Sequence, residues 1–143
     1  ASLPEKLWPT DKWSFVLEKL KIKGHRVGLI GAKPSAQRDH WKGADAEDDL
    51  VCRGLVEDFR GAFTMPQVVG ALSKVRAVLT IDNGILHLAV AAETPTVGLF
   101  RHGIHRLWAP PFEHLTVLTP GEGREVAEIE EARVLEAIQR VLR

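Results

Sequence analysis

The sequence predicts an α/β fold: a three-layer, Rossmann-like domain built on a mainly parallel sheet. Short apolar runs alternate with amphipathic helical patterns, which is typical of a parallel sheet covered by helices on both faces. The clearest unit is a strand, a polar elbow, a helix and a second strand between residues 77 and 100. The chain of 143 residues is long enough for one domain with a hydrophobic core, so we assign 1–143 to one domain.

The first helix is predicted from Pro9-Thr10 to the turn at Gly24. Its apolar stripe has helical spacing and consists of Trp13, Val16, Leu17 and Leu20. Residues 26–31 are expected to form a buried strand, and residues 35–47 a polar helix. An α/β unit should begin with a strand, whereas this chain begins with a helix. We therefore expect a central strand upstream of Ala1.

Residues 50–52 are predicted to form a short strand in which Cys52 is a buried, small apolar residue. Residues 53–64 are then expected to be a loop. Because Cys52 is the one cysteine of the chain, an internal disulfide and a cysteine metal cluster are excluded.

The second half of the chain has a regular alternation of elements. Thr64 is expected to cap a helix over 66–74, with Pro66 tolerated in its first turn. The remaining predictions are strands over 77–81, 96–100 and 115–118, a loop over 101–113, and helices over 84–92 and 125–142.

The elbow after the strand 77–81 is the strongest candidate for a binding site. In open parallel sheets, ligands bind where strands end and helices begin, and the free amides of a helix N-terminus suit phosphate. Gly84 lets the backbone approach a ligand closely. Asp82 is either a helix cap or a ligand contact, and the two roles can coexist. His87 is a structural residue of the first helical turn or a flank of the pocket.

Two further groups carry positive charge. Lys6 precedes Trp8-Pro9 and is either a surface lysine or a ligand contact. The loop after the strand 96–100 is either a solvated loop or a screen for the charge of a diphosphate. Its basic residues are Arg101, His102, His105 and Arg106.

Several function classes are disfavoured. The net charge is zero, which argues against a broad nucleic-acid surface. The sequence contains no Walker motif, no Gly-x-Gly-x-x-Gly fingerprint, no Gly-x-Ser-x-Gly elbow and no His-Glu-x-x-His pair. We therefore expect no metal and no cofactor, and a Rossmann oxidoreductase is disfavoured. No apolar stretch approaches the roughly 20 residues that cross a bilayer.

Three segments in this order resemble the C-terminal half of the family-nine glycosyltransferases, the ADP-heptose:lipopolysaccharide heptosyltransferases and their relatives. They are Lys-x-Trp-Pro at 6–9, a strand ending in Gly31, and Asp-Asn-Gly-Ile-Leu-His-Leu-Ala-Val-Ala-Ala with Thr-Pro-Thr-Val-Gly-Leu-Phe at 82–100. The family pattern is Asp-Ser/Thr-Gly-x-x-His-Leu-x-Ala-Ala, followed by Pro-x-Val-x-Leu-Phe-Gly. The resemblance implies one half of a GT-B architecture, in which two Rossmann-like domains face a cleft.

The resemblance also implies a set of donor-binding residues. Lys6 would contact the donor diphosphate with Ser2 beside it, and Met65 would lie near the base. Asp82 would face sugar hydroxyls. The amides near Asn83, Gly84 and Ile85 would meet the phosphates, with His87 close by, and Arg101 and His102 are possible phosphate-side residues.

The function implied is the donor-binding part of a cytoplasmic enzyme of lipopolysaccharide biosynthesis, with peripheral association at the inner membrane left open. The implied partners are a nucleotide-diphosphate sugar, with heptose as one candidate sugar, a glycan or glycolipid acceptor, and an N-terminal GT-B domain that lies outside this chain. That domain would supply the acceptor site and a carboxylate base, so this chain alone is predicted to be inactive. The alternative is a non-catalytic module that binds a nucleotide or nucleotide-sugar.

Overall fold

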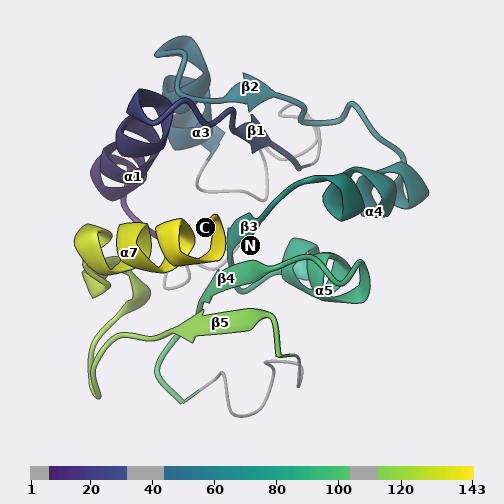
Figure 1. Cartoon of the computed structure of the whole chain (residues 1–143). Coiled ribbons are helices and arrows are strands. Elements are labelled where there is room, and N and C mark those ends of the chain that lie inside the picture. Colours follow the sequence, from purple (N-terminus) through teal and green to yellow (C-terminus); the bar gives the residue numbers. More distant parts are fainter. Residues whose placement is uncertain (1–6, 32–43, 104–112) are drawn as a thin grey trace.

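The described strands are all paired in parallel. A computed structural model describes residues 7–31, 44–103 and 113–143. Strand β1 (Gly28–Leu29) pairs with β2 (Glu57–Asp58), and β4 (Thr96–Leu99) lies between β3 (Val78–Ile81) and β5 (Leu115–Leu118). Figure 1 shows the described strands stacked in the order β2, β1, β3, β4, β5. The predicted α/β fold with parallel strands is confirmed.

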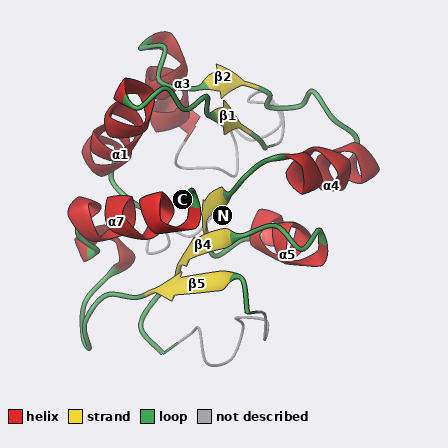
Figure 2. Ribbon diagram, viewed as in Figure 1, coloured by secondary structure: helices red, strands yellow, loops and turns green. Residues whose placement is uncertain are grey.

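Helices cover the strands on two sides and complete three layers (Figure 2). Helices α1 (Thr10–Ile22) and α7 (Glu131–Val141) pack together on one side, and α4 (Met65–Lys74) and α5 (Gly84–Ala91) on the other. Helix α3 (Ala44–Cys52) packs against α1. Among the described residues, no helix has the length and apolar character needed to cross a bilayer.

The largest hydrophobic cluster lies between the α1–α7 layer and the strands. Its fully buried members include Val16 of α1, Val97 and Leu99 of β4, and Val134 of α7. A second cluster joins Val68 and Leu72 of α4 to Val78 of β3 and Ala89 of α5. The apolar stripe predicted for the first helix therefore faces the core, with Val16, Leu17 and Leu20 buried.

Local chemistry sets the ends of the helices as predicted. Thr64 and Gln67 form a capping box at the start of α4, with each side chain accepting the other residue's amide. Helix α1 starts directly after Pro9 and is followed by Gly24, which has a left-handed φ of 86°.

The predicted strand at 50–52 is wrong, because these residues form the last turn of α3. Leu50 is buried against Leu17 and Leu55, while Cys52 is exposed rather than buried. An apolar run of three residues fits the inner side of a helix as well as a strand, and the sequence alone does not separate the two. Residues 35–43 of the predicted polar helix lie outside the described residues, and 44–47 are helical.

Strand β2 lies within the segment predicted to be a loop. Its two residues, Glu57 and Asp58, are charged and exposed, as suits a strand at a sheet edge. Its partner β1 is shorter than the predicted strand 26–31, and Gly28 is exposed where a buried strand was expected. The sequence pattern thus predicted a strand at β1 that was too long and too buried, and it did not predict β2.

The predicted final helix 125–142 is two elements. A short 3-10 helix, η2 (Val126–Glu128), is followed by an extended Ile129 and Glu130 before α7 begins. The Trp8 indole donates to the Ile129 carbonyl at 3.0 Å, and Lys12 Nζ donates to the carbonyls of Ala127 and Ile129 at 2.7 and 3.1 Å. These side chains from before and within α1 satisfy carbonyls that a continuous helix would have used itself.

Candidate functional site

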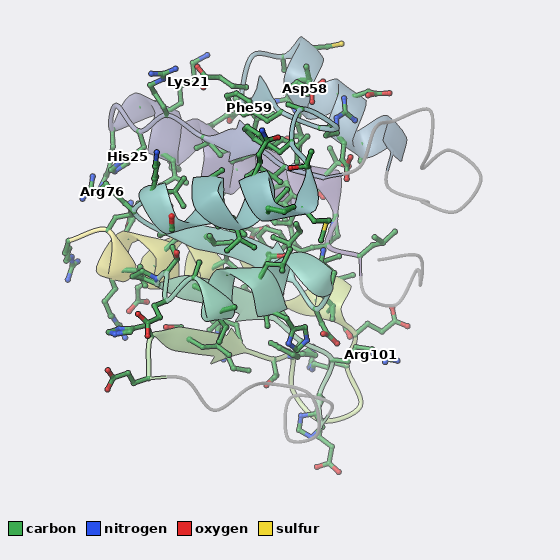
Figure 3. All side chains as sticks on the ribbon, turned by 90° about the vertical axis from the view of Figure 1, so that its right-hand side faces the viewer. Lys21, His25, Asp58, Phe59, Arg76 and Arg101 are labelled. Atoms are coloured by element: carbon green, nitrogen blue, oxygen red, sulfur yellow. The ribbon has the colours of Figure 1, made fainter. Side chains whose placement is uncertain are left out.

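The predicted site residues that the structure describes gather at one edge of the domain. Because the paired strands are parallel, their carboxyl ends meet at the same edge, where the following helices begin. Met65 starts α4 there, Asp82 follows β3, and Arg101 follows β4. In Figure 3, Arg101 lies toward one side of the molecule, and Lys21, His25 and Arg76 lie toward the other.

The elbow between β3 and α5 is built around the side chain of Asn83. Its Oδ1 accepts the amides of Ile85 at 3.0 Å and Leu86 at 3.4 Å, and the Thr80 hydroxyl at 3.2 Å. Asn83 is therefore the N-cap of α5, a position that favours Asn, Asp, Ser and Thr. The capping role considered for Asp82 belongs to its neighbour.

Asp82 is buried, with 8% of its surface exposed. Its amide donates to the Leu99 carbonyl at 3.1 Å, which ties the end of β3 to the end of β4. A buried carboxylate is retained in a fold only where polar groups satisfy it. Because Asn83 forms the cap of α5, the structure gives the capping role to Asn83 and places the Asp82 side chain at the buried end of β3.

The amides at the start of α5 are not equivalent. The Ile85 amide is already engaged by Asn83, so the predicted phosphate contact from this residue competes with the cap. Gly84 is the first residue of α5, and its amide has no carbonyl partner within the helix. A Cβ added to Gly84 meets no heavy atom within 4 Å, so the backbone is open to an approaching ligand.

The remaining described candidates are accessible side chains around this elbow. His87 is exposed one turn into α5, His102 is exposed after β4, and Arg101 is half-buried. Met65 is 64% exposed at the start of α4. Ser2, Lys6, His105 and Arg106 lie outside the described residues.

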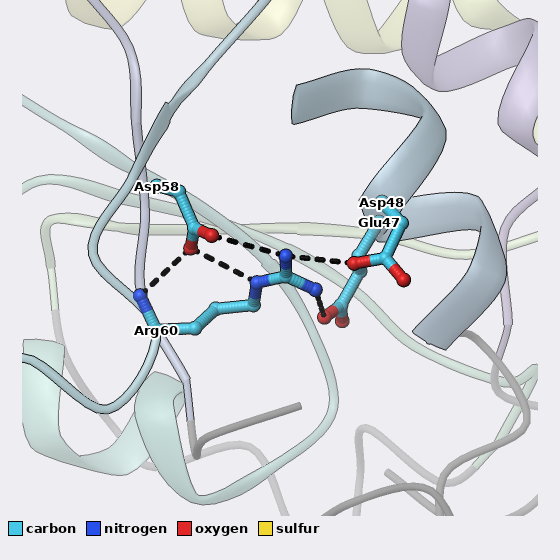
Figure 4. A network of polar contacts seen from close by, with 4 residues as sticks. All are labelled: Glu47, Asp48, Asp58 and Arg60. Atoms are coloured by element: carbon cyan, nitrogen blue, oxygen red, sulfur yellow. Dashed lines mark hydrogen bonds and ion pairs between the residues drawn. The ribbon is translucent and has the colours of Figure 1, made fainter. Parts of the chain in front are cut away.

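A polar network at the end of β2 was not predicted (Figure 4). The Arg60 guanidinium, whose side chain is 4% exposed, binds Asp58 at 3.0 and 3.1 Å, Asp48 at 2.8 Å and Glu47 at 3.4 Å. The Arg60 amide also donates to Asp58 at 3.0 Å. The network joins α3 to the end of β2 and fixes the chain that leads into α4.

The hydrogen bonds from the side chain and the backbone amide of Arg60 lower the pKa of Asp58 below its ordinary value of 3.8. In return, the hydrogen bond to Asp58 raises the pKa of Arg60 further above its ordinary value. The spacing Asp-x-Arg at 58–60 is a local signal of such a pair. The partners on α3 lie 12 and 13 residues away, so only the fold reveals them.

Two aromatic rings lie in the same connection. Phe59 and Phe63 stack with ring centroids 5.9 Å apart and an interplanar angle of 21°. Phe63 is two residues before Met65, so the aromatic pair in the connection between β2 and α4 is followed by an exposed thioether at the first residue of α4. Surfaces of this kind suit the flat face of a ring.

A parallel α/β fold with a helix N-terminus and a glycine at a strand's carboxyl end defines a Rossmann-like class of domain, and this arrangement suits phosphorylated ligands. The family model of glycosyltransferase family 9 (heptosyltransferase) matches residues 1–137. The chain therefore belongs to glycosyltransferase family 9.

A curated relative agrees with this assignment, and two solved structures share the fold. Lipopolysaccharide heptosyltransferase 3 of Escherichia coli K12 is 33% identical over 122 residues. The glycosyl transferase family 9 structure from Veillonella parvula has a TM-score of 0.80 at 19% identity and covers 99% of this chain. The structure of E. coli heptosyltransferase WaaC with ADP has a TM-score of 0.79 at 19% identity, also over 99% of this chain. The two solved structures share the fold of this chain.

The matches cover only part of the relatives. The alignment with the E. coli K12 relative spans 77% of this chain but 31% of that protein. The two structures are covered to 43% and 42% of their chains. The chain thus corresponds to about a third of the curated relative and about two fifths of the solved structures.

Proposed function

We propose that this chain is the donor-binding domain of a glycosyltransferase that transfers a sugar from a nucleotide-diphosphate sugar to a lipopolysaccharide-type glycan. Membership of family 9 supports this proposal, and so does the presence of ADP in a structure with the same fold. The observation that carries it is the convergence of Asp82, the Gly84 amide and the Arg101–His102 segment at one strand edge.

In this proposal the domain holds the donor and stabilises the leaving group. The Gly84 amide and the N-terminus of α5 bind a phosphate, and Arg101 and His102 offset charge on the departing diphosphate. Asp82 accepts hydrogen bonds from sugar hydroxyls. Lys6 and Ser2, which lie outside the described residues, are proposed as further contacts to the diphosphate.

Ring-binding surfaces suggest where the base is held. Met65 is exposed at the start of α4, and the Phe59–Phe63 pair lies in the preceding connection. We place the nucleotide base against this segment, in line with the expectation that Met65 lies near the base. The Arg60 network then acts as a positioning device, because it fixes the chain that carries both rings.

The acceptor side of the reaction belongs to a second domain in this proposal. Transfer requires a base that deprotonates the acceptor hydroxyl, and an N-terminal GT-B domain would supply it. The 143-residue chain should then bind the donor without transferring sugar. We place the assembled enzyme in the cytoplasm, where it would meet a glycolipid acceptor at the inner membrane.

Isothermal titration of the chain with ADP-, UDP- and GDP-sugars tests the proposal. One nucleotide class should bind, and the isosteric variant Asp82→Asn should weaken that binding by about tenfold, the loss of one charge-assisted hydrogen bond. Lys74→Ala, at the end of α4 on the opposite edge, is the matched control and should bind as the wild type does. Absence of binding to every member of the panel would reject a donor-binding role.

A further inference from the structure

The edge opposite the candidate site holds a group of basic side chains, together with the acidic Glu93 after α5 and Glu113 before β5. The helices return from the carboxyl ends of the strands to their amino ends, so the helix C-termini gather at this edge. Basic residues occupy the last turns of three helices: Lys19 and Lys21 in α1, Lys74 in α4 and Arg140 in α7. Figure 3 shows Lys21, His25 and Arg76 along this side.

Hydrogen bonds between helix ends confirm that these segments are neighbours. Lys21 Nζ donates to the Gly54 carbonyl just after α3, at 3.1 Å. The Arg76 guanidinium donates to the Leu142 carbonyl at the end of α7. The C-terminal ends of α1 and α3 are thus joined, and Arg76, two residues after α4, is joined to the end of α7.

Two exposed aliphatic side chains lie inside this positive charge. Ile22 is 78% exposed between Lys21 and Lys23, and Val75 is 42% exposed between Lys74 and Arg76. The other two large hydrophobic side chains exposed in the described part of the chain, Phe59 and Met65, follow β2 instead. We call the two basic–apolar–basic triplets, 21–23 and 74–76, the basic edge.

Helix dipoles account for only part of this pattern. A dipole favours cations in the last turn, but it does not account for the placement of Ile22 and Val75 between those cations. Within the described ranges, Lys23 and Lys74 form no ion pair with an acidic side chain. Beside the first triplet, a groove lined by Lys21, His25, Arg26 and Glu57 adds further polar surface.

We propose that the basic edge docks the domain on an anionic phospholipid bilayer. Lysine and arginine bind lipid phosphates, while a flanked aliphatic side chain enters the boundary between headgroups and acyl chains. The two triplets offer one aliphatic and two basic side chains each, which fits a surface of anionic headgroups above acyl chains. Single-stranded nucleic acid would instead call for aromatic platforms, and both triplets lack aromatic residues.

The docking surface rests on the proposed function for its biological context, because a glycolipid acceptor resides in a membrane. The basic edge and the candidate donor site lie at opposite ends of the strands. Docking therefore leaves the donor site facing away from the lipid, on the side toward which a glycan extends from the bilayer.

Vesicle co-sedimentation of the 143-residue chain tests the docking surface. The chain should bind vesicles that contain phosphatidylglycerol and should bind neutral phosphatidylcholine vesicles far more weakly, with affinity falling as salt rises. Reversing one charge with Lys74→Glu should weaken binding by more than about fivefold, because each basic residue near an anionic surface contributes about fivefold and the new carboxylate is repelled by that surface. Ile22→Asp should also weaken it.

Arg124→Glu is the matched control, since it makes the same charge change near the other edge, where Arg124 follows β5 and is 65% exposed. It should bind vesicles as the wild type does, and circular dichroism should show that all variants are folded. Nucleotide titration of Lys74→Glu should match the wild type, which separates this proposal from donor binding. The docking surface is rejected if anionic vesicles do not bind, if Arg124→Glu weakens binding equally, or if the edge binds only nucleic acid or acidic peptides.

Discussion

Asn83 holds the start of α5 through its side chain, whose Oδ1 lies 3.0 Å from the amide nitrogen of Ile85. Asn83→Ala removes this cap and should lower the free energy of unfolding by about 1 kcal/mol. Urea denaturation followed by circular dichroism measures the change. Asn83→Thr should retain most of the stability, because threonine also caps helices. Equal destabilisation by both substitutions would contradict the capping role.

The glycine after this cap is expected to matter for binding rather than for stability. A Cβ on Gly84 meets no heavy atom within 4 Å, and the residue is already helical. Gly84→Val should therefore change the free energy of unfolding by no more than about 0.5 kcal/mol. It should weaken donor binding by about tenfold, because the branched side chain would stand between the helix amide and a phosphate. Titration calorimetry and urea denaturation of the same preparation separate the two effects.

Sequence reasoning located the candidate site because the site is local. Asp82, Asn83 and Gly84 are consecutive, and the pattern of a strand followed by a capped helix depends only on residues that are adjacent in the sequence. The sequence did not show which residue of the elbow caps α5. Aspartate and asparagine are equally good caps, so only the structure shows that Asn83 takes the Ile85 amide and that Asp82 does not.

The predictions from sequence failed where contacts between residues far apart in the chain determine the structure. Strand β2 consists of two charged residues and is held by its pairing with β1, which no local periodicity reports. The break before α7 follows from donation by Trp8 and Lys12, more than 110 residues away along the chain. Arg60 likewise has partners on α3 that its own neighbourhood does not indicate.

Gly98 is required by the packing of β4 against α5. A Cβ at this position would lie 2.7 Å from Leu86 Cδ1 and 2.9 Å from Phe100 Cε1. Both side chains are fully buried and have little room to move. Gly98→Ala should therefore lower the free energy of unfolding by about 1–3 kcal/mol, the usual cost of overpacking.

Gly70→Ala provides the matched control for Gly98, since Gly70 lies within α4 and its added Cβ meets nothing within 4 Å. This substitution should stabilise the protein by about 0.5–1 kcal/mol, because alanine loses less entropy in a helix. Urea denaturation of the two variants should shift in opposite directions. A shift in the same direction would argue against close packing at Gly98.

The Arg60 network should make stability depend on acid pH. Arg60→Ala leaves Glu47, Asp48 and Asp58 without their shared cation, and we expect a loss of about 2 kcal/mol at pH 7. This is below the loss for a fully buried pair, because the side chains of Asp48 and Asp58 are 42% and 37% exposed and water screens them. Arg60→Lys should recover only part of the loss, since lysine cannot form the bidentate contact with Asp58.

The sign of the pH effect follows from the lowered pKa of Asp58. A carboxyl whose pKa is lower in the folded state stabilises the fold above its ordinary pKa of 3.8, and this contribution disappears as the pH falls through the folded value. The wild type should therefore lose its advantage over Arg60→Ala as the pH is lowered from about 5 to about 2. Urea midpoints measured at several pH values across this range test the expectation. A gap between the two proteins that stays constant down to the lowest pH would show that Arg60 contributes by packing, not by its bond to the Asp58 carboxylate.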